Sequence, residues 1–221
     1  EMLKEVMLGI DSKNKHVVVT TFSSHIARLN SIVEFGQKMK RKIVFMGRSM
    51  SKYVRAAEAT GIAKFTNRVE VLKFSGQIKR KLKKVAKDRG KYLMVVTGHQ
   101  GEPKSTLAKM MNGELKFKFF PEDHIIFSCR TIPTPTNIEN RQKLEANLRS
   151  FNVRIFKDIH QSGHAAREDL RELINLVKPQ HIIPAHGEPR MLNALADLAV
   201  EMGYKKGTNV HVMGNGERIK L

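Results

Sequence analysis

The sequence predicts an α/β fold in which a mostly parallel sheet is flanked by helices on both faces. Short β-branched runs recur along the chain, and most are followed by a longer segment with apolar residues at helical spacing. This alternation is typical of parallel strands that are connected by helices covering the sheet. With 221 residues, 41% of them hydrophobic, the chain can bury one large core or two small ones.

In the first half of the chain, a helix is expected over residues 1–10, where apolar residues recur at helical spacing. The expected strands of this half cover residues 16–22, 43–46 and 69–74. Ser23 or Ser24 is expected to cap the helix that follows the first strand. Gly47 then allows the chain to turn into another helix, which ends near Gly61.

In the second half, the expected strands cover residues 92–96, 125–128, 153–159 and 181–184. A short helix is expected to begin at Pro103, and longer helices cover residues 137–150, 165–178 and 189–203. Residues 210–221 are expected to close the chain as a hairpin around Gly214-Asn215-Gly216.

The charge balance indicates a polyanionic partner. The chain has 40 Lys and Arg residues against 21 Asp and Glu residues, which gives a formal net charge of +19. Nucleic acid is the commonest partner of so basic a surface, and an acidic membrane is its main rival. Because aromatic residues make up only 6% of the chain and Trp is absent, contacts to a nucleic-acid backbone are favoured over base stacking. Residues 77–91 contain eight basic residues and one acidic residue, Asp88. We interpret this segment as a solvated helix face that adds to the positive electrostatic potential of the protein.

Other features place limits on the class of protein. No apolar run approaches the roughly 20 residues that a transmembrane helix needs, and the amino terminus lacks the pattern of a signal peptide. The single cysteine, Cys129, excludes an internal disulfide and fits a reducing, cytoplasmic location.

Two histidine-containing stretches carry the chemistry. They are Asp158–Ala165, with His160 and His164, and Pro184–Glu188, with His186. Each follows an apolar run and contains glycine, so these imidazoles are expected on loops after successive strands, where they favour metal binding or acid–base work. The alternative is that each is a structural histidine beside a glycine. Ser162 and Gly163, together with the start of the next helix, offer donors suited to a phosphate.

Six motifs occur in order along nearly the whole chain. They are Thr20-Thr-Phe-Ser-Ser24, Gly47-Arg-Ser-Met50, Thr97-Gly-His-Gln-Gly-Glu-Pro103, Phe127-Ser-Cys-Arg-Thr-Ile-Pro133, His160-Gln-Ser-Gly-His-Ala165 and Pro184-Ala-His-Gly-Glu188. This ordered set resembles the ribonuclease J branch, archaeal and bacterial, of the β-CASP metallo-β-lactamase family. The resemblance implies a β-CASP domain over residues 1–150 and the C-terminal part of a metallo-β-lactamase αββα domain over residues 151–221.

The resemblance implies a metal-dependent ribonuclease that degrades RNA 5′-to-3′ from a 5′-monophosphate end by hydrolysing phosphodiesters. Such an enzyme uses two zinc ions, or manganese, and is expected to be a cytoplasmic homodimer or higher homo-oligomer without a membrane partner. His186 matches the last metal ligand of the family, and His164 matches the histidine that acts at the scissile phosphate as an acid or transition-state stabiliser. Glu188 is then a support for the metal ligands or, with equal weight, a carboxylate at a helix start.

The same resemblance implies a set of residues that bind RNA phosphates. Its members come from three loops and are His160, Ser162, Gly163 and Ala165; Ser23, Ser24 and Arg28; and Gly98, Gln100 and Glu102. Residues 47–49 either face the substrate as well or form a simple turn. His25, His99, Cys129–Thr131 and Thr134–Thr136 depart from the usual residues of substrate-facing loops, which leaves the substrate preference open.

The largest departure is the absence of the family's first metal motif, His-x-His-x-Asp-His. We therefore expect the chain to be a fragment that by itself neither holds two metals nor cleaves RNA; the alternative is a natural inactive paralogue. Two rival functions remain: a cleavage-factor-like endoribonuclease or DNA-processing nuclease of the same superfamily, and a non-catalytic RNA-binding or dimerisation module.

Overall fold

The computed structural model describes residues 2–157, 159 and 165–220, and the chain divides into two compact units, residues 1–160 and 161–221. The first unit contains six strands: β1 (Val17–Thr20), β2 (Lys42–Met46), β3 (Val69–Leu72), β4 (Tyr92–Val96), β5 (His124–Phe127) and β6 (Arg154–Phe156). They form one sheet in the order β3-β2-β4-β1-β5-β6, and every neighbouring pair is parallel. The predicted fold class is thereby confirmed.

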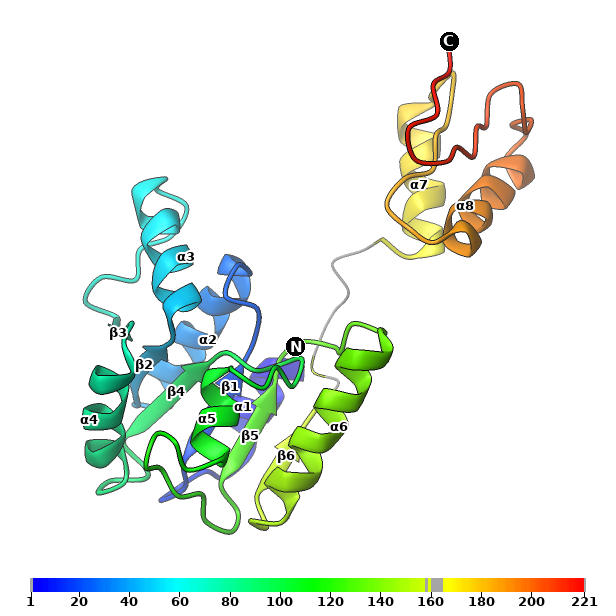
Figure 1. Ribbon diagram of the computed structural model, residues 1–221. Helices are drawn as coiled ribbons and strands as arrows, with labels where there is room; N and C mark the ends of the chain where they lie inside the picture. The colour runs from blue at the N-terminus through cyan, green and yellow to red at the C-terminus, as the bar shows by residue number, and fades with distance from the viewer. Residues whose placement is uncertain (1, 158, 160–164, 221) are drawn as a thin grey trace. The chain divides into compact units, whose positions relative to one another are not determined.

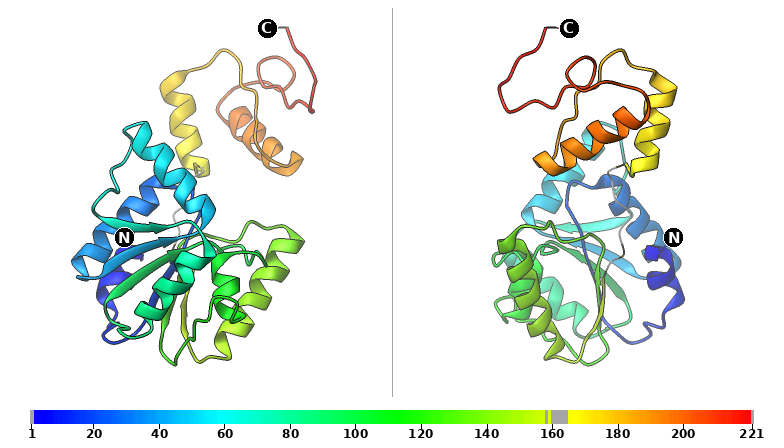
Figure 2. Two further views of the ribbon diagram at one scale, coloured as in Figure 1. Left: turned by 60° about the vertical axis from the view of Figure 1, so that its left-hand side comes forward. Right: turned by 90° about the vertical axis from the view of Figure 1, so that its right-hand side faces the viewer.

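Helices cover both faces of this sheet (Figure 1, Figure 2). On one face lie α1 (Met2–Gly9), α2 (Ile26–Lys38) and α3 (Arg48–Ala59), and on the other lie α4 (Ser75–Val85), α5 (Thr106–Met111) and α6 (Pro135–Arg149). Each helix turns apolar residues at helical spacing toward the sheet, as Ile78, Leu82 and Val85 of α4 do. The basic residues of α4 therefore lie mainly on its outer side, as the sequence predicts for residues 77–91.

The residues that start α2 and α5 differ from those that the sequence predicts. His25, rather than Ser23 or Ser24, caps α2, because its Nδ1 atom accepts the main-chain N–H of Arg28 at 3.2 Å. Helix α5 begins at Thr106 with Ser105 as its cap, three residues after Pro103, and the Ser105 hydroxyl accepts the N–H of Ala108 at 3.3 Å. The prediction that Pro103 stands at the helix start is thus wrong, because a hydroxyl cap close by satisfies the helix N–H groups.

The amino end of the sheet is fixed by the carboxylate of Asp123, which is fully buried just before β5. It accepts hydrogen bonds from the main chain and imidazole of His16, both at 2.9 Å, from the N–H of Phe120 at 2.8 Å and from Arg89. Burial alone would raise the pKa of Asp123, but the hydrogen bonds from His16 and Arg89 lower it below its usual value. This network joins the starts of β1 and β5 and leaves the opposite edge of the sheet for ligands.

The second unit consists of α7 (Arg167–Val177), α8 (Pro189–Glu201) and irregular chain around a small core that includes Ile174, Ile182 and Val210. Among its described residues, the predicted strand over 181–184 and hairpin over 210–221 are wrong: only isolated parallel bridges form there, which pair Val210 with Ile182 and with Lys206. Pro184 has no N–H with which to extend the bridge at Ile182. No helix in the described part of the chain is both long and apolar enough to cross a bilayer.

Candidate nucleic-acid interface

The loops that follow the parallel strands meet at one edge of the sheet, because all six strands point the same way. Four of these connections contain sequence motifs, and they are residues 21–25 after β1, 47–49 after β2, where α3 already begins at Arg48, 97–105 after β4 and 128–134 after β5. Residues far apart in the sequence are therefore neighbours at this edge. It is the part of the first unit where a ligand of an open α/β sheet is expected.

The loop after β1 contacts the first turn of α3 through Ser23 and Ser49, whose hydroxyl oxygens lie 3.0 Å apart. Ser23 is buried, Ser24 is exposed and Arg28 is partly exposed on the first turn of α2. Ser24 and Arg28 thus have side chains that a ligand can reach, whereas Ser23 contacts the start of α3.

The loop after β4 approaches residues of α5 and α6 so closely that it needs glycine. A Cβ atom on Gly98 would lie 2.7 Å from the Ser105 hydroxyl, and one on Gly101 would lie 2.4 Å from the carbonyl carbon of Asn140 in α6. Both glycines also have positive φ angles, 126° and 79°. The loop is therefore held tightly between α5 and α6.

Gln100 joins the loops after β4 and β5. Its side-chain amide donates to the carbonyl of Arg130 at 3.0 Å and accepts the N–H of Ile132 at 2.8 Å. Its main-chain N–H donates to the carboxylate of Glu102 at 3.0 Å. Gln100 is buried, so its amide positions the two loops, and Glu102 is engaged with the backbone in the same place.

His99 lies under this surface rather than on it. Its ring is 5% exposed, packs against Phe22 with 3.8 Å between ring centroids, and has no hydrogen-bond partner for either nitrogen among the described residues. Burial, opposed by Glu102 and assisted by the charge of Arg141, lowers the pKa of His99 to about 4. The imidazole is therefore neutral at pH 7 and adds no charge to the interface.

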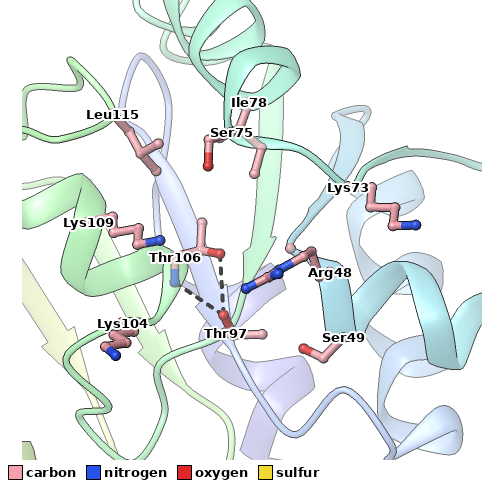
Figure 3. A pocket seen from close by; sticks show the side chains of 11 residues that line it. Arg48, Ser49, Lys73, Ser75, Ile78, Thr97, Lys104, Thr106, Lys109 and Leu115 are labelled. Carbon is pink, nitrogen blue, oxygen red and sulfur yellow. Dashed lines mark hydrogen bonds between the residues drawn. The ribbon is translucent and has the colours of Figure 1, made fainter.

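A pocket of about 270 Å³ opens between the ends of β2, β3 and β4 (Figure 3). It is lined by Gly47, Arg48, Ser49, Lys73, Ser75, Ile78, Thr97, Lys104, Thr106, Lys109 and Leu115. Four of these side chains are cationic, four carry hydroxyls and none is acidic. The pocket is accordingly suited to an anion.

In the second unit, His186 lies in the loop before α8, is exposed and has a positive φ of 62°. Glu188 occupies the N-cap position of α8, where its carbonyl accepts the N–H of Met191 at 2.8 Å, and Ala165 is exposed ahead of α7. The remaining predicted residues of this region, His160, Ser162, Gly163 and His164, lie outside the described residues. The structure therefore does not test whether His164 and His186 converge.

The donor chemistry of His186 suits zinc, which binds imidazole nitrogen, but zinc needs about four ligands. The described residues contain no group of three or more His, Cys, Asp or Glu side chains that could hold a metal ion. The described part of the chain does not, by itself, make up a metal site.

Comparison with known proteins identifies the family. The family profile described as "Ribonuclease J, beta-CASP domain" matches residues 14–144, more than half of the chain. The chain belongs to the ribonuclease J family. The profile described as "Zn-dependent metallo-hydrolase RNA specificity domain" matches residues 151–213. The family resemblance inferred from the six motifs is confirmed.

Several relatives named ribonuclease J match along the chain. The protein from Pyrococcus abyssi is 44% identical over 220 residues, which cover 100% of this chain and 48% of that protein. The protein from Methanocaldococcus jannaschii is 40% identical over 217 residues, 98% of this chain and 48% of the relative. "Ribonuclease J 1" from Streptococcus pyogenes is 31% identical, with 99% of this chain and 38% of the relative covered. The chain thus spans about half the length of the first two of these relatives.

The ribonuclease J motifs contain only some of the residues that line the pocket. Sequence reasoning considered residues 47–49 as a substrate-facing turn but missed Lys73, Lys104 and Lys109, which belong to no motif singled out there. A signal was present for Lys104, which follows the expected strand over residues 92–96 by eight residues, whereas Lys73 lay inside the expected strand over residues 69–74, which in the structure ends at Leu72. The position of Lys109 inside a helix gave no such signal.

Proposed function

We propose that this chain forms part of a metal-dependent ribonuclease that degrades RNA 5′-to-3′ from a 5′-monophosphate end. The observation that carries the proposal is the pair of family matches, a ribonuclease J β-CASP domain followed by an RNA specificity domain, in that order over residues 14–213. The basic pocket at the carboxyl edge of the sheet supports it, because RNA presents phosphates that such a surface can bind.

In this proposal, His186 supplies one ligand to a pair of zinc or manganese ions, and His164 acts at the scissile phosphate. The exposure of His186 supports its role, since a ligand must be open to the metal. Ser24 and Arg28 contact RNA phosphates directly, together with the loop of His160, Ser162, Gly163 and Ala165. Ser23, Gly98, Gln100 and Glu102 hold the RNA-binding loops in position through the contacts described above.

We further propose that the β-CASP domain covers residues 1–150, that residues 151–221 belong to the metallo-β-lactamase domain, and that the active protein is a homodimer or higher homo-oligomer. A cytoplasmic location is supported by the single, buried Cys129, because a chain with one thiol forms no internal disulfide.

The test is a chimera in which this chain replaces the matching segment of the Pyrococcus abyssi relative, 48% of that protein. The chimera receives RNA with a 5′-monophosphate and a label at the 3′ end, in zinc or manganese. We expect full-length RNA to disappear without discrete intermediates and a 5′-triphosphate to block the reaction. The unmodified relative is the positive control, and circular dichroism verifies that the chimera is folded.

Substitutions in the chimera test the two histidines. His186→Ala is expected to abolish cleavage and lower the metal content, whereas His164→Ala slows cleavage with metal still bound. Internal fragments that form regardless of the 5′ end would instead support an endonuclease. A folded chimera that binds RNA but does not cleave it with any divalent metal would support a non-catalytic binding module.

A further inference from the structure

The pocket above β2 lies where the chain's connections diverge. The chain leaves β2 into α3, on the face shared with α1 and α2, but it leaves β3 and β4 into α4 and α5 on the other face. Adjacent strands whose connections go to opposite faces leave a crevice outside their carboxyl ends, and ligands of open α/β sheets bind in such crevices. The position of the pocket is therefore that of a ligand site, independently of its charge.

The floor of this pocket is rigid. Thr97 Oγ1 accepts the N–H of Thr106 at 3.2 Å and donates to Thr106 Oγ1 at 3.3 Å, and the Thr106 hydroxyl bonds in turn to the carbonyl of Met46 at 3.3 Å. Gly47 comes so near that a Cβ atom there would lie 3.3 Å from Thr106 Oγ1. These bonds fix the ends of β2 and β4 relative to each other before any ligand arrives.

Two cations point into the pocket from opposite sides. Figure 3 shows the guanidinium of Arg48 and the ammonium of Lys109 directed toward the space above Thr97 and Thr106, with the hydroxyl of Ser75 directed toward it from above. Lys73 and Lys104 complete the lining, and Lys73 extends outward. An anion held between Arg48 and Lys109 would thus have further positive charge around it.

These cations are not neutralised by the protein itself. In the described part of the chain, no carboxylate forms an ion pair with Arg48, Lys73, Lys104 or Lys109, whereas other basic residues, such as Lys81 and Lys143, do pair with acids. Like charges gathered around one cavity repel each other. An anionic ligand would relieve this repulsion, so electrostatics favour the binding of an anion in the pocket.

We propose that this pocket is a phosphate-binding site that holds a backbone phosphate of single-stranded RNA, with Arg48 and Lys109 as its charged contacts and Ser75 as a hydroxyl donor. The identity of the polymer as RNA rests on the proposed function; the phosphate chemistry rests on the pocket. Arginine binds two phosphate oxygens at once, lysine acts as a point charge, and the hydroxyl supplies a third donor. A cavity of about 270 Å³ has room for a phosphate and an attached sugar rather than for a large cofactor.

The experiment measures binding of a fluorescent 12-nucleotide single-stranded RNA to the full chain by anisotropy. The double variant Arg48→Met/Lys109→Met is expected to weaken binding at least tenfold and to make the salt dependence shallower, by about 0.7 in log–log slope for each phosphate that the protein no longer neutralises. Ser75→Ala, which changes no charge, is expected to weaken binding about threefold.

The matched control is Lys83→Met/Lys84→Met, which removes two charges from the exposed side of α4 outside the pocket. Equal weakening in both double variants would overturn the proposal, since only the general field would then matter. Thermal unfolding verifies that each variant is folded. If the Arg48/Lys109 variant is not folded, the proposal is tested instead by the RNA affinity of Ser75→Ala and by whether RNA shifts the NMR signal of the Arg48 side chain. RNA with an uncharged methylphosphonate backbone should leave that signal unmoved.

A shift of the Arg48 signal by inorganic phosphate but not by RNA would assign the pocket to free phosphate and overturn the RNA assignment. The outcome is separable from the proposed function. If the chimera cleaves RNA but Arg48→Met/Lys109→Met binds RNA as well as the unmodified chain does, only the proposed phosphate site is refuted. If Arg48→Met/Lys109→Met binds RNA more weakly but the chimera does not cleave RNA, only the proposed nuclease function is refuted.

Discussion

At the scale of single residues, His124 shows how burial sets a charge state. It begins β5, is 1% exposed and packs against Phe156 with 5.1 Å between ring centroids. Its Nε2 atom has no hydrogen-bond partner among the described residues. Burial first, and then the positive charges of Arg154, Lys15 and Arg41, lower the pKa of His124 to about 4. The folded protein therefore keeps this imidazole neutral where the unfolded chain would protonate it.

This difference predicts a pH dependence of stability. Between the unfolded pKa of 6.5 and the folded value of about 4, the unfolded chain binds the extra proton, so stability is full above pH 6.5 and falls as the pH is lowered. In His124→Phe this contribution is absent. We expect the stability difference between wild type and variant to change by about 2 kcal/mol, in favour of the variant, from pH 8 to pH 5.

Urea unfolding at the two pH values measures this change. The difference at pH 8 reports the packing effect of the substitution alone, because His124 is neutral there in both states, and other titrating groups cancel between the two proteins. A difference that stays constant from pH 8 to pH 5 would contradict the lowered pKa.

Residue identity was predictable, but residue role was only partly so. Glu188 was predicted either to support the metal ligands or to stand at a helix start, and it occupies the N-cap position of α8. The motifs selected Gln100 as a possible substrate contact, yet the structure places its amide between two backbone segments. In a sequence, a glutamine whose buried amide bridges two loops cannot be distinguished from a glutamine that contacts a substrate. Only the partner atoms, which come from distant residues such as Arg130 and Ile132, distinguish them.

At the scale of elements, the loop after β4 depends on its contact with α6. Gly101 lies against the backbone of Asn140 and Arg141, and Arg141 donates to the carbonyl of His99 at 2.6 Å. Arg141 also packs over the ring of Phe127 at 3.3 Å from its centroid. The loop and the helix consequently form one packed assembly at the edge of the sheet.

A pair of glycine substitutions measures this packing. Gly101 and Gly113 have similar φ angles of 79° and 76°, but a Cβ atom on Gly113 would meet nothing within 4 Å. Gly113→Ala should therefore cost only the backbone strain, about 1 kcal/mol, whereas Gly101→Ala adds overpacking for a total of about 3 kcal/mol.

Urea midpoints at constant m-value provide the measurement. Equal destabilisation of the two variants would indicate that the loop can move away from α6 at little cost in free energy. That result would contradict the tight packing inferred at Gly101.

Elements were predictable where their signal was local. The four central strands β1, β2, β4 and β5 are apolar and almost fully buried, and they lie within a few residues of their predicted ranges. The strand predicted at 181–184 failed because its apolar run is compatible with a single bridge to Val210, and the pairing partner rather than the run decides whether a strand extends. Helix starts failed for a related reason, since several capping residues stand close together.

At the scale of the whole molecule, the net charge of +19 predicts how RNA binding responds to salt. Backbone contacts release counterions, so with about four phosphates engaged the affinity for single-stranded RNA should fall roughly 30-fold or more between 50 and 200 mM salt. Because few aromatic side chains are available for stacking, shuffled RNA sequences should bind within about threefold of each other. Anisotropy titrations over this range test both statements, and affinity that is insensitive to salt would contradict a backbone-binding surface.

The architecture of the sheet also bears on how the protein is made. Of the six strands of this sheet, β1 is synthesised first, but it lies in the interior of the sheet between β4 and β5, and all four of its residues are buried. As the chain leaves the ribosome, Val17–Thr20 has no partner until Tyr92–Val96 has emerged, and its second edge stays open until His124–Phe127 follows. A growing chain with an unpaired apolar strand invites aggregation, and pairing across so many residues is slow. We therefore expect the nascent first unit to remain prone to aggregation until β5 has been synthesised.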